Sequence, residues 1–310
     1  MTETRTSDSV DRGSRPLAVD IASLVVCSLI WGTTWRAIKL QVGFVPVFDS
    51  VVYRFALASA LLFGWCVLRG RPIALTRAQH LAVLGQGACG FTVQYSLVYL
   101  AEERISSGAM AVIFSAIAFA NLVLFRIALK QIPSRLAWAG SLLGLAGVAA
   151  MSWSQVGHEG ARAGGAVGVM LALVGVVMAT FGNFFAHRAQ SAGVETVPGT
   201  AWAMGYGAAL LAAFVLITGG KWSFDPSPPY VGALLYLAVF GSVTAFVVYY
   251  GLARRRGYAV ASYIAALTPP TAMFMSWLFE GAQWGVDALG GLALVLTGQV
   301  LLIRGSRTQR

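Results

Sequence analysis

Aromatic and polar residues recur at helical spacing within stretches of this sequence that are otherwise almost purely apolar. Trp31 and Trp35 are one helical turn apart beside Thr34, and Asn183 and Phe184 follow about 150 residues later. Indole faces stack on planar groups and attract cations, while hydroxyl and amide groups form hydrogen bonds. These residues are therefore candidates for binding a planar or zwitterionic small molecule. The alternative is that the tryptophans anchor helices at a membrane surface.

A second set of candidates lies along one face of a predicted helix, where polar residues recur at multiples of about four positions. Gln86 and Gln94 lie on this face with Tyr95 and Tyr99 adjoining it, and Tyr263 lies among other tyrosines later in the chain. Amide and phenol groups on one face can hydrogen-bond the ammonium or carboxylate group of a ligand. The same groups can instead bond between helices, which in membranes contributes about 0.6 kcal/mol per bond. Both interpretations stay open at this point.

Arg54 is the most costly side chain to place, because it stands inside an apolar stretch. A centrally placed arginine costs about 2.5 to 3.5 kcal/mol on membrane-insertion scales, so it needs a counter-charge. Asp49 lies about 140° away around a helix and is poorly aligned. We therefore expect Glu280 to be its structural ion-pair partner, in preference to direct binding of a substrate carboxylate.

Two adjacent prolines interrupt a later apolar stretch. Pro269 and Pro270 lack the N–H groups of a helix interior, so they are expected to break a helix near its centre. A kinked helix can rearrange locally while its neighbours move as rigid bodies. The pair is therefore a candidate hinge.

The sequence contains no pattern that indicates catalysis. It has no phosphate-binding loop of the G-x-x-x-x-G-K-[ST] type, no cluster of metal ligands and no nucleophile beside a base. We expect no catalytic residue, no metal, no cofactor and no enzymatic activity. Because no stretch of spanning length carries Asp, Glu or His near its midpoint, we also expect no proton coupling.

The elements that must position these residues are membrane-spanning helices. Hydrophobic residues make up 57% of the chain and charged residues only 11%, a balance that excludes an ordinary soluble domain. A helix of about 20 apolar residues crosses a bilayer. Seven uncharged stretches reach that length, namely 81–101, 105–125, 136–155, 164–185, 197–219, 230–253 and 257–279. Three more, 17–38, 46–69 and 285–304, reach it when end charges snorkel or an internal charge is paired. We therefore expect ten helices in an all-α integral membrane protein.

The positive charges predict the orientation of these helices. With ten spans, 16 Lys and Arg residues fall on one side and 5 on the other, and cytoplasmic loops retain positive charge. The tails 1–16 and 305–310 are therefore expected in the cytoplasm, and no removable signal peptide is visible. The net charge of +10 then reflects topology, so nucleic acid is excluded as a partner.

The chain also contains a weak internal repeat. Trp31 and Gly32 match Phe181 and Gly182 at an offset of about 150 residues. Five spans per half is an odd number, so two halves fused head to tail enter the membrane with opposite orientations. We expect inverted five-helix repeats at 17–155 and 164–304 around a central cavity.

These features together resemble the drug/metabolite transporter superfamily, specifically its EamA-type members, which include a branch that exports aromatic amino acids. The resemblance rests on WG-x-x-W-x-x-I-K from Trp31, on the Pro46 to Arg54 spacing, and on the later series Pro269, Glu280, Gly281, Gly291 and Gly298. It covers about residues 17–304 and implies a monomeric ten-helix bundle in the inner membrane. It also implies export of small metabolites through a cavity between the halves.

The aromatic and amide candidates then favour amino acids, particularly aromatic or other large neutral ones, as substrates carried by alternating access. An exporter of lipophilic cations would need a carboxylate within the membrane, and a nucleotide-sugar or nucleoside carrier would need clustered basic groups. The sequence shows neither feature. The expected partners are a small-molecule substrate and the lipid bilayer.

Overall fold

The computed structural model describes residues 17–130, 132–159, 164–281 and 283–307. These residues form helices joined by loops and contain no β-strand, which confirms the all-α expectation for the described part of the chain. From the amino end the elements are α1 (Leu17–Lys39), α2 (Val47–Leu68), α3 (Arg77–Gly87), the π-helix η1 (Ala88–Val93), α4 (Gln94–Glu102), α5 (Ser107–Phe114), α6 (Ile117–Leu129), α7 (Arg135–Glu159), α8 (Gly165–Ser191), α9 (Thr196–Ile217), α10 (Pro228–Tyr236), the π-helix η2 (Leu237–Thr244), α11 (Ala245–Arg256), α12 (Tyr258–Ala261), α13 (Tyr263–Glu280) and α14 (Val286–Arg307).

Seven helical segments among the described residues are long and apolar enough to cross a membrane. They are Ala18–Lys39, Val47–Leu68, Arg77–Glu102, Ser107–Leu129, Gly165–Ser191, Thr196–Ile217 and Pro228–Arg256. The other three expected spans coincide with α7, with α12 and α13, and with α14, where Val286–Leu301 forms a shorter apolar helix. The structure thus supports a multi-spanning protein, and the count of ten stays a prediction.

Helix α8 shows how the sequence fits a membrane-embedded bundle. Its buried face carries small residues such as Gly168, Ala172 and Gly175, which let neighbouring helices approach closely. Its opposite face exposes large apolar side chains, including Met170 and Val177. In a soluble protein the exposed face would be polar. This reversal indicates that lipid is the solvent around the helix.

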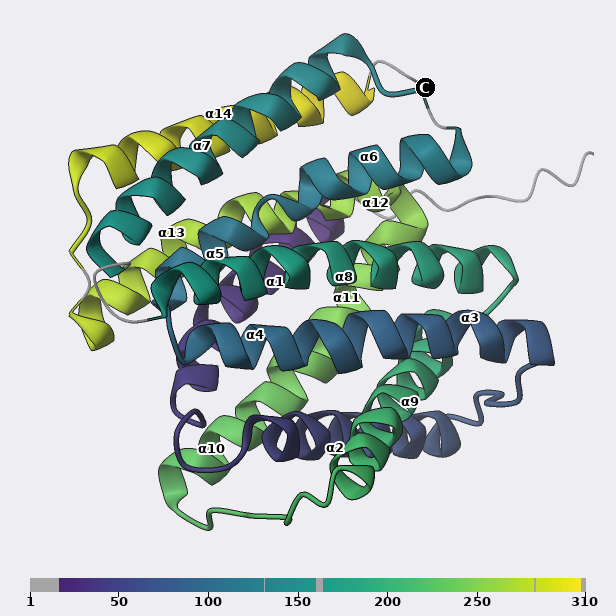
Figure 1. The fold of residues 1–310 in the computed structure, drawn as a ribbon. Coiled ribbons are helices and arrows are strands. Elements are labelled where there is room, and N and C mark those ends of the chain that lie inside the picture. Colours follow the sequence, from purple (N-terminus) through teal and green to yellow (C-terminus); the bar gives the residue numbers. More distant parts are fainter. Residues whose placement is uncertain (1–16, 131, 160–163, 282, 308–310) are drawn as a thin grey trace, which may run out of the picture.

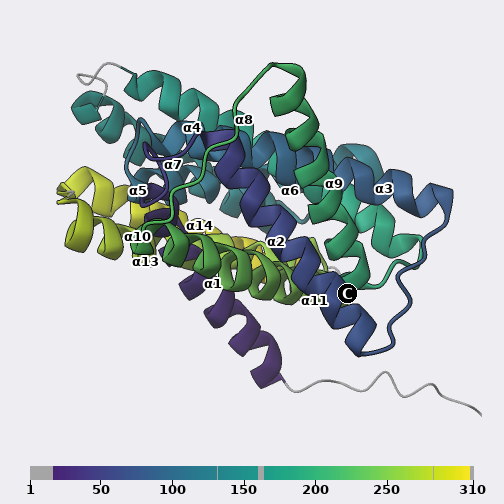
Figure 2. The ribbon, with the colours of Figure 1, turned by 90° about the horizontal axis from the view of Figure 1, so that it is seen from below.

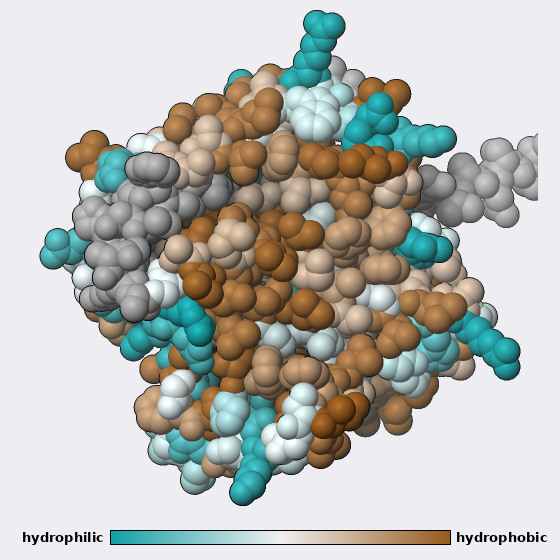
Figure 3. All heavy atoms as spheres, in the orientation of Figure 1, coloured by the Kyte–Doolittle hydropathy of each residue, from teal (hydrophilic) through white to brown (hydrophobic). Residues whose placement is uncertain are grey.

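Exposed apolar side chains also dominate the surface. On the face shown in Figure 3, hydrophobic residues cover most of the middle and hydrophilic ones gather towards the edges. Large apolar side chains such as Leu29, Phe214 and Phe274 are about half exposed. A patch of this extent on a soluble monomer would cause association. Here it is the surface that a bilayer covers.

Most helices run between two ends of the bundle (Figure 1). At one end the last turn of α13 meets the start of α5, where Ser107 donates a hydrogen bond to Glu280. At the other end Arg254 of α11 donates to the carbonyl of Val194, in the loop between α8 and α9. We call these the Glu280 end and the Arg254 end. Helices α2 and α9 pack together and cross at a steep angle (Figures 1 and 2).

Two of the long helices contain a π-helical segment near their middle. Helices α3 and α4 continue into each other through η1, and α10 and α11 through η2. In η2 the Thr244 hydroxyl donates to the carbonyl of Val239, five residues earlier, at 3.0 Å. In η1 the Thr92 hydroxyl donates to the carbonyl of Gly207 on α9 at 2.9 Å. Such wider turns shift the faces that a helix presents and occur often at functional sites.

Two other long helices are interrupted by a short break. Helices α5 and α6 are separated at Ser115, whose hydroxyl donates to the Val112 carbonyl at 2.6 Å. Helices α12 and α13 are separated at Ser262, whose hydroxyl donates to the Tyr258 carbonyl at 2.7 Å. A serine bonded back onto its own helix offers the backbone an alternative to the helical pattern.

The structure corrects the expected position of the break in the second of these helices. Pro269 and Pro270 lie inside α13, which continues through both of them, and the break lies earlier, at Ser262. Proline removes one N–H donor, yet it does not end a helix whose surrounding helices hold it in place. Pro269 instead leaves the carbonyl of Ala265, four residues earlier, without its usual helical donor.

Small residues bring several helices into close contact. A Cβ atom on Gly32 of α1 would lie 2.5 Å from the Cβ of Thr271 on α13. A Cβ atom on Gly147 of α7 would lie 2.5 Å from the carbonyl oxygen of Gly291 on α14. Backbones can approach this closely only where no side chain intervenes. Helices α7 and α14 accordingly lie side by side (Figure 1).

Candidate functional site

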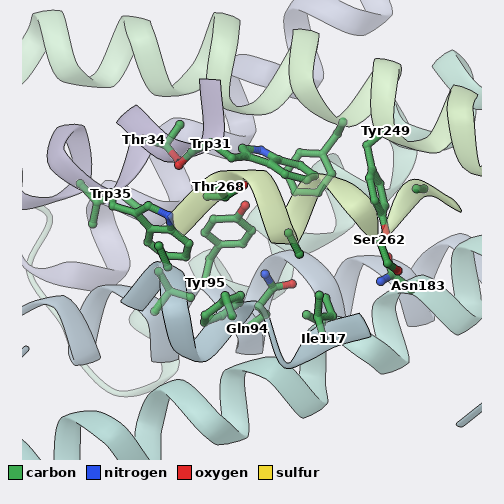
Figure 4. Close-up of a pocket in the computed structure, with 18 of the residues that line it drawn as sticks. Trp31, Thr34, Trp35, Gln94, Tyr95, Ile117, Asn183, Tyr249, Ser262 and Thr268 are labelled. Carbon is green, nitrogen blue, oxygen red and sulfur yellow. The ribbon is translucent and has the colours of Figure 1, made fainter. Parts of the chain in front are cut away.

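A central pocket lies where α1, α4, α8 and α11 meet the two interrupted helices (Figure 4). Its empty volume, including the space at its mouth, is about 790 Å³. Six of the residues singled out by the sequence line it, namely Trp31, Thr34, Trp35, Gln94, Tyr95 and Asn183. The described residues of its wall include no Asp, Glu, Lys, Arg or His.

Aromatic rings form one wall of the pocket. The Trp31 ring lies 5.2 Å from that of Phe246 and 5.3 Å from that of Tyr249, measured between centroids. Its indole N–H donates to the carbonyl of Gly241 in η2 at 3.3 Å. Trp31 therefore belongs to the pocket wall, and the interpretation of it as a membrane-surface anchor does not fit its position.

The part of the pocket nearer the Glu280 end combines aromatic and hydrogen-bonding groups. Trp35 packs against Phe114 with ring centroids 5.2 Å apart. Its side chain is only 8% exposed, and its indole nitrogen has no protein acceptor among the described residues. Thr34 and Tyr95 lie beside it in Figure 4. Trp35 can therefore offer one unused hydrogen-bond donor to a molecule in the pocket.

Towards the Arg254 end the pocket is closed by three polar side chains. Asn183 of α8 donates to Asn121 of α6 at 3.3 Å, and Asn121 donates to Ser262 at 3.2 Å. Asn183 and Ser262 line the central pocket, with Tyr249 directed towards them (Figure 4). Asn121 lines a second cavity beyond them. We call Asn121, Asn183 and Ser262 the polar septum.

The second cavity lies on the Arg254 side of the septum, and we call it the vestibule. Its wall includes Phe125, His187, Gln190, Arg254 and Tyr258. Its empty volume, including open space, is about 980 Å³. The vestibule and the central pocket therefore form two compartments, separated by a short row of hydrogen-bonded side chains.

A separate polar cluster joins α1, α4, α5 and α13 at the Glu280 end. The Glu280 carboxylate accepts hydrogen bonds from the Ser107 hydroxyl at 2.5 Å and from the Ser276 hydroxyl at 2.9 Å. Lys39 donates to the backbone carbonyls of Glu102 and Ile105 at 2.6 and 2.8 Å. These bonds connect four helices on the side of the pocket opposite the polar septum.

Arg54 does not form the ion pair that the sequence favours. Its Nε donates to the Ser242 hydroxyl at 2.9 Å, and its guanidinium carbon lies 4.6 Å from the centre of the Tyr95 ring. The carboxylate of Glu280 is bonded to serines, and that of Asp49 accepts from the Ser223 amide at 2.9 Å. The expected Arg54–Glu280 pair is therefore wrong, because helices α2 and α13 place the two groups in different clusters.

Four other residues that the sequence predicts to bind substrate are not among the described residues that line the central pocket. Gln86 lines a small neighbouring cavity, and the Tyr99 hydroxyl donates to Gln41 at 2.9 Å. Phe184 packs against Phe125, away from the pocket. The side chain of Tyr263 lies outside the described residues.

The pocket also contains residues that the sequence reasoning did not assign to it. Phe246, Tyr249 and Tyr250 line it from α11, and Thr268 lines it from α13. The aromatic residues lie at positions i, i+3 and i+4, so the spacing of one helix face was available as a signal. Tyr249 and Tyr250 are buried, although three arginines follow them within seven residues.

The model of the EamA-like transporter family matches this chain twice, at residues 20–153 and 166–304. The Escherichia coli K12 protein named uncharacterized inner membrane transporter YedA is 28% identical over 293 residues, which are 94% of this chain and 92% of that protein. A WAT1-related chloroplastic protein of Arabidopsis thaliana is 23% identical and covers 97% of this chain and 73% of its own length.

A solved crystal structure shares the fold. It superposes with a TM-score of 0.69 and covers 94% of this chain and 99% of its own chain, at 19% sequence identity. At this identity the likeness concerns the fold alone.

Proposed function

The chain belongs to the EamA-like transporter family, and from this membership we propose that it exports amino acids, aromatic or other large neutral ones, across the inner membrane. The observation that carries the proposal is the central pocket, whose described wall combines aromatic rings with hydroxyl and amide groups and has no Asp, Glu, Lys, Arg or His. Aromatic faces suit a large apolar side chain, and neutral polar groups suit the zwitterionic backbone of an amino acid.

Ten membrane-spanning helices in two inverted repeats, 17–155 and 164–304, remain part of this proposal. The two π-helical segments support it, because η2 begins about 150 residues after η1, near the offset of the sequence repeat. Each segment lies near the middle of a long helix, as symmetry-related features would. The Arg254 end is then cytoplasmic, and both termini lie on that side.

Alternating access follows from the two clusters on either side of the pocket. The polar septum is the proposed inner gate between pocket and vestibule, and the cluster around Glu280 is the proposed outer gate. The substrate enters the vestibule from the cytoplasm, passes the septum and lies against Trp31. The inner gate then re-forms before the Glu280 cluster separates. Two gates that open in turn prevent a continuous channel.

The proposed transport is downhill export or exchange. The described pocket wall carries no carboxylate or imidazole that could accept a proton at mid-pocket, and proton-driven carriers use such groups. An imposed pH gradient should therefore leave the rate of uptake unchanged.

Uptake into proteoliposomes tests the proposal. Labelled phenylalanine, tryptophan and leucine are compared with a nucleoside and a cationic dye, each with and without a proton gradient. We expect saturable uptake of at least one amino acid, reduced at least about tenfold by Trp31→Leu because the indole contacts the substrate. Trp138→Leu is the matched control, since Trp138 packs against Phe119 outside the pocket wall. Uptake of only the dye or the nucleoside would contradict the proposal.

A further inference from the structure

We propose that Arg54 makes the central pocket selective for a carboxylate-bearing molecule, whose negative charge lies at the part of the pocket formed by Thr34, Trp35 and Tyr95. The inference deepens the proposed function, because it rests on this pocket being the transport site. It assigns Arg54 as a specificity-determining residue that acts from behind the pocket wall.

The guanidinium of Arg54 is buried without a counter-charge. Its side chain is 1% exposed, and no carboxylate among the described residues forms an ion pair with it. Its Nε is satisfied by Ser242, whereas its Nη1 has no protein acceptor in the described part of the chain. The usual structural explanation of a buried arginine, a bidentate carboxylate partner, is therefore missing here.

The charge of Arg54 lies directly behind the pocket wall. Its guanidinium carbon is 4.6 Å from the centre of the Tyr95 ring, and Tyr95 lines the pocket. A Cβ atom on Gly241 would lie 3.3 Å from Nη2 of Arg54 and 2.8 Å from Cγ2 of Thr34, which also lines the pocket. The guanidinium therefore contacts the Tyr95 ring of the pocket wall and lies beside Gly241, which packs against Thr34 of the same wall.

Three carboxylates, those of Asp49, Glu102 and Glu280, contact groups other than Arg54. The Asp49 carboxylate accepts from the Ser223 amide, and Glu102 lies with Lys39 at an N–O distance of 3.8 Å. The Glu280 carboxylate is bonded to Ser107 and Ser276. The positive charge therefore acts on the pocket contents through a region of low dielectric, where the field of an ion is strong.

A second donor points to the same kind of ligand group. The buried indole N–H of Trp35 has no protein acceptor, and it lines the pocket beside Thr34 and Tyr95 (Figure 4). A carboxylate only accepts hydrogen bonds, so it complements an unused donor and a nearby cation together. An ammonium group complements neither of them.

The test compares three ligands of the same shape and different charge. Phenylpropionate, phenylpropanamide and phenylpropylamine are titrated against purified protein, and binding is followed by tryptophan fluorescence and by the shift in melting temperature. We expect the carboxylate to bind at least about tenfold more tightly than the amine, with the amide between them. An amine that binds as tightly as the carboxylate overturns the proposal. This comparison uses the unaltered protein, so it does not depend on the folding of a variant.

Variants then assign the preference to Arg54. In Arg54→Gln the ratio between carboxylate and amine should fall to about threefold or less, whereas Arg54→Lys should retain a preference for the carboxylate. Arg69→Gln is the matched control, because Arg69, which follows the last residue of helix α2, also has its guanidinium carbon 4.6 Å from an aromatic ring, that of Trp65, but is exposed. An unchanged ratio in a folded Arg54→Gln overturns the assignment.

The outcomes for the two proposals are separable. A preference for the carboxylate without amino-acid uptake would reject the proposed function and leave the role of Arg54 intact. Amino-acid uptake by a protein that binds the three ligands equally would reject the role of Arg54 and leave the proposed function intact.

Discussion

At the scale of single residues, the unusual feature of this protein is that polar N–H groups are buried beside its pocket without a hydrogen-bond partner among the described residues, which costs free energy. Trp35 and Arg54 each bury an N–H group without a protein acceptor in the described structure, and such a group costs about 1 to 3 kcal/mol. Both lie towards the Glu280 end of the pocket. A ligand in the pocket can recover this part of the cost.

The polar septum gives a prediction at this scale. Asn121→Ala removes the side chain that links Asn183 to Ser262, so the barrier between pocket and vestibule should open more often. With Ala265→Cys as a reporter in a cysteine-free background, labelling by an impermeant thiol reagent from the Arg254 side should accelerate about eightfold. This factor corresponds to the loss of both hydrogen bonds of Asn121, at about 0.6 kcal/mol each, the average for an interhelical hydrogen bond in membranes.

Ser96→Ala is the control for the septum experiment. It removes a hydroxyl that donates to the Thr92 carbonyl within one helix, at 2.8 Å and outside the pocket wall. It should leave the labelling rate unchanged. A rate in Asn121→Ala that is equal to the control would show that the septum does not act as a gate.

At the scale of elements, the π-helix η2 sets the distance between α1 and α2 behind the pocket. Gly241 allows Thr34 and Arg54 to approach, since a Cβ atom there would lie 2.8 Å from Cγ2 of Thr34. Gly241→Ala should therefore lower the stability by about 1 to 3 kcal/mol, the usual cost of overpacking. The melting temperature of the purified protein measures the effect.

Gly232 provides the comparison for this substitution. It lies on α10 within the same long helix, and a Cβ atom there would meet nothing within 4 Å. Gly232→Ala should leave the melting temperature unchanged or raise it slightly, because alanine favours the helix. Equal melting temperatures for the two variants would reject the packing argument.

The prolines of α13 give a second prediction for an element. Pro269 and Pro270 do not break the helix in this structure, but they weaken its hydrogen bonding beside the pocket. A hinge role remains our prediction, so replacing both by alanine should slow transport severalfold while the helix stays intact. The uptake rate in proteoliposomes measures this, and a rate equal to that of the unaltered protein would reject the hinge.

At the scale of the whole molecule, the inverted repeat requires an even number of spans. Tags placed before Leu17 and after Arg307 should therefore be reached by impermeant reagents from the same face of the membrane, the cytoplasmic one. The measurement is protease or reagent access in intact cells and in inverted vesicles. Tags that are reached from opposite faces would contradict the ten-span topology and the export direction together.

Much of this architecture could be predicted from the sequence because it depends on local properties. Apolar length fixes where helices can cross a bilayer, and the described residues form long helices over seven of the expected apolar segments. Helical spacing also identified Trp31, Trp35, Gln94 and Tyr95, which line the pocket together. Each of these inferences needs only the order of residues along one helix.

The sequence by itself therefore determined that the chain is helical, is embedded in a membrane and carries aromatic and polar residues on one face of several helices. These three properties follow from composition and periodicity. Only the tertiary structure decided which groups meet across helices. It separated Arg54 from Glu280, moved the helix break from Pro269 to Ser262, and brought Asn121 to Asn183. The reason is that contacts between helices depend on rotation, crossing and close approach at glycines, which are set by all the neighbours of a helix together.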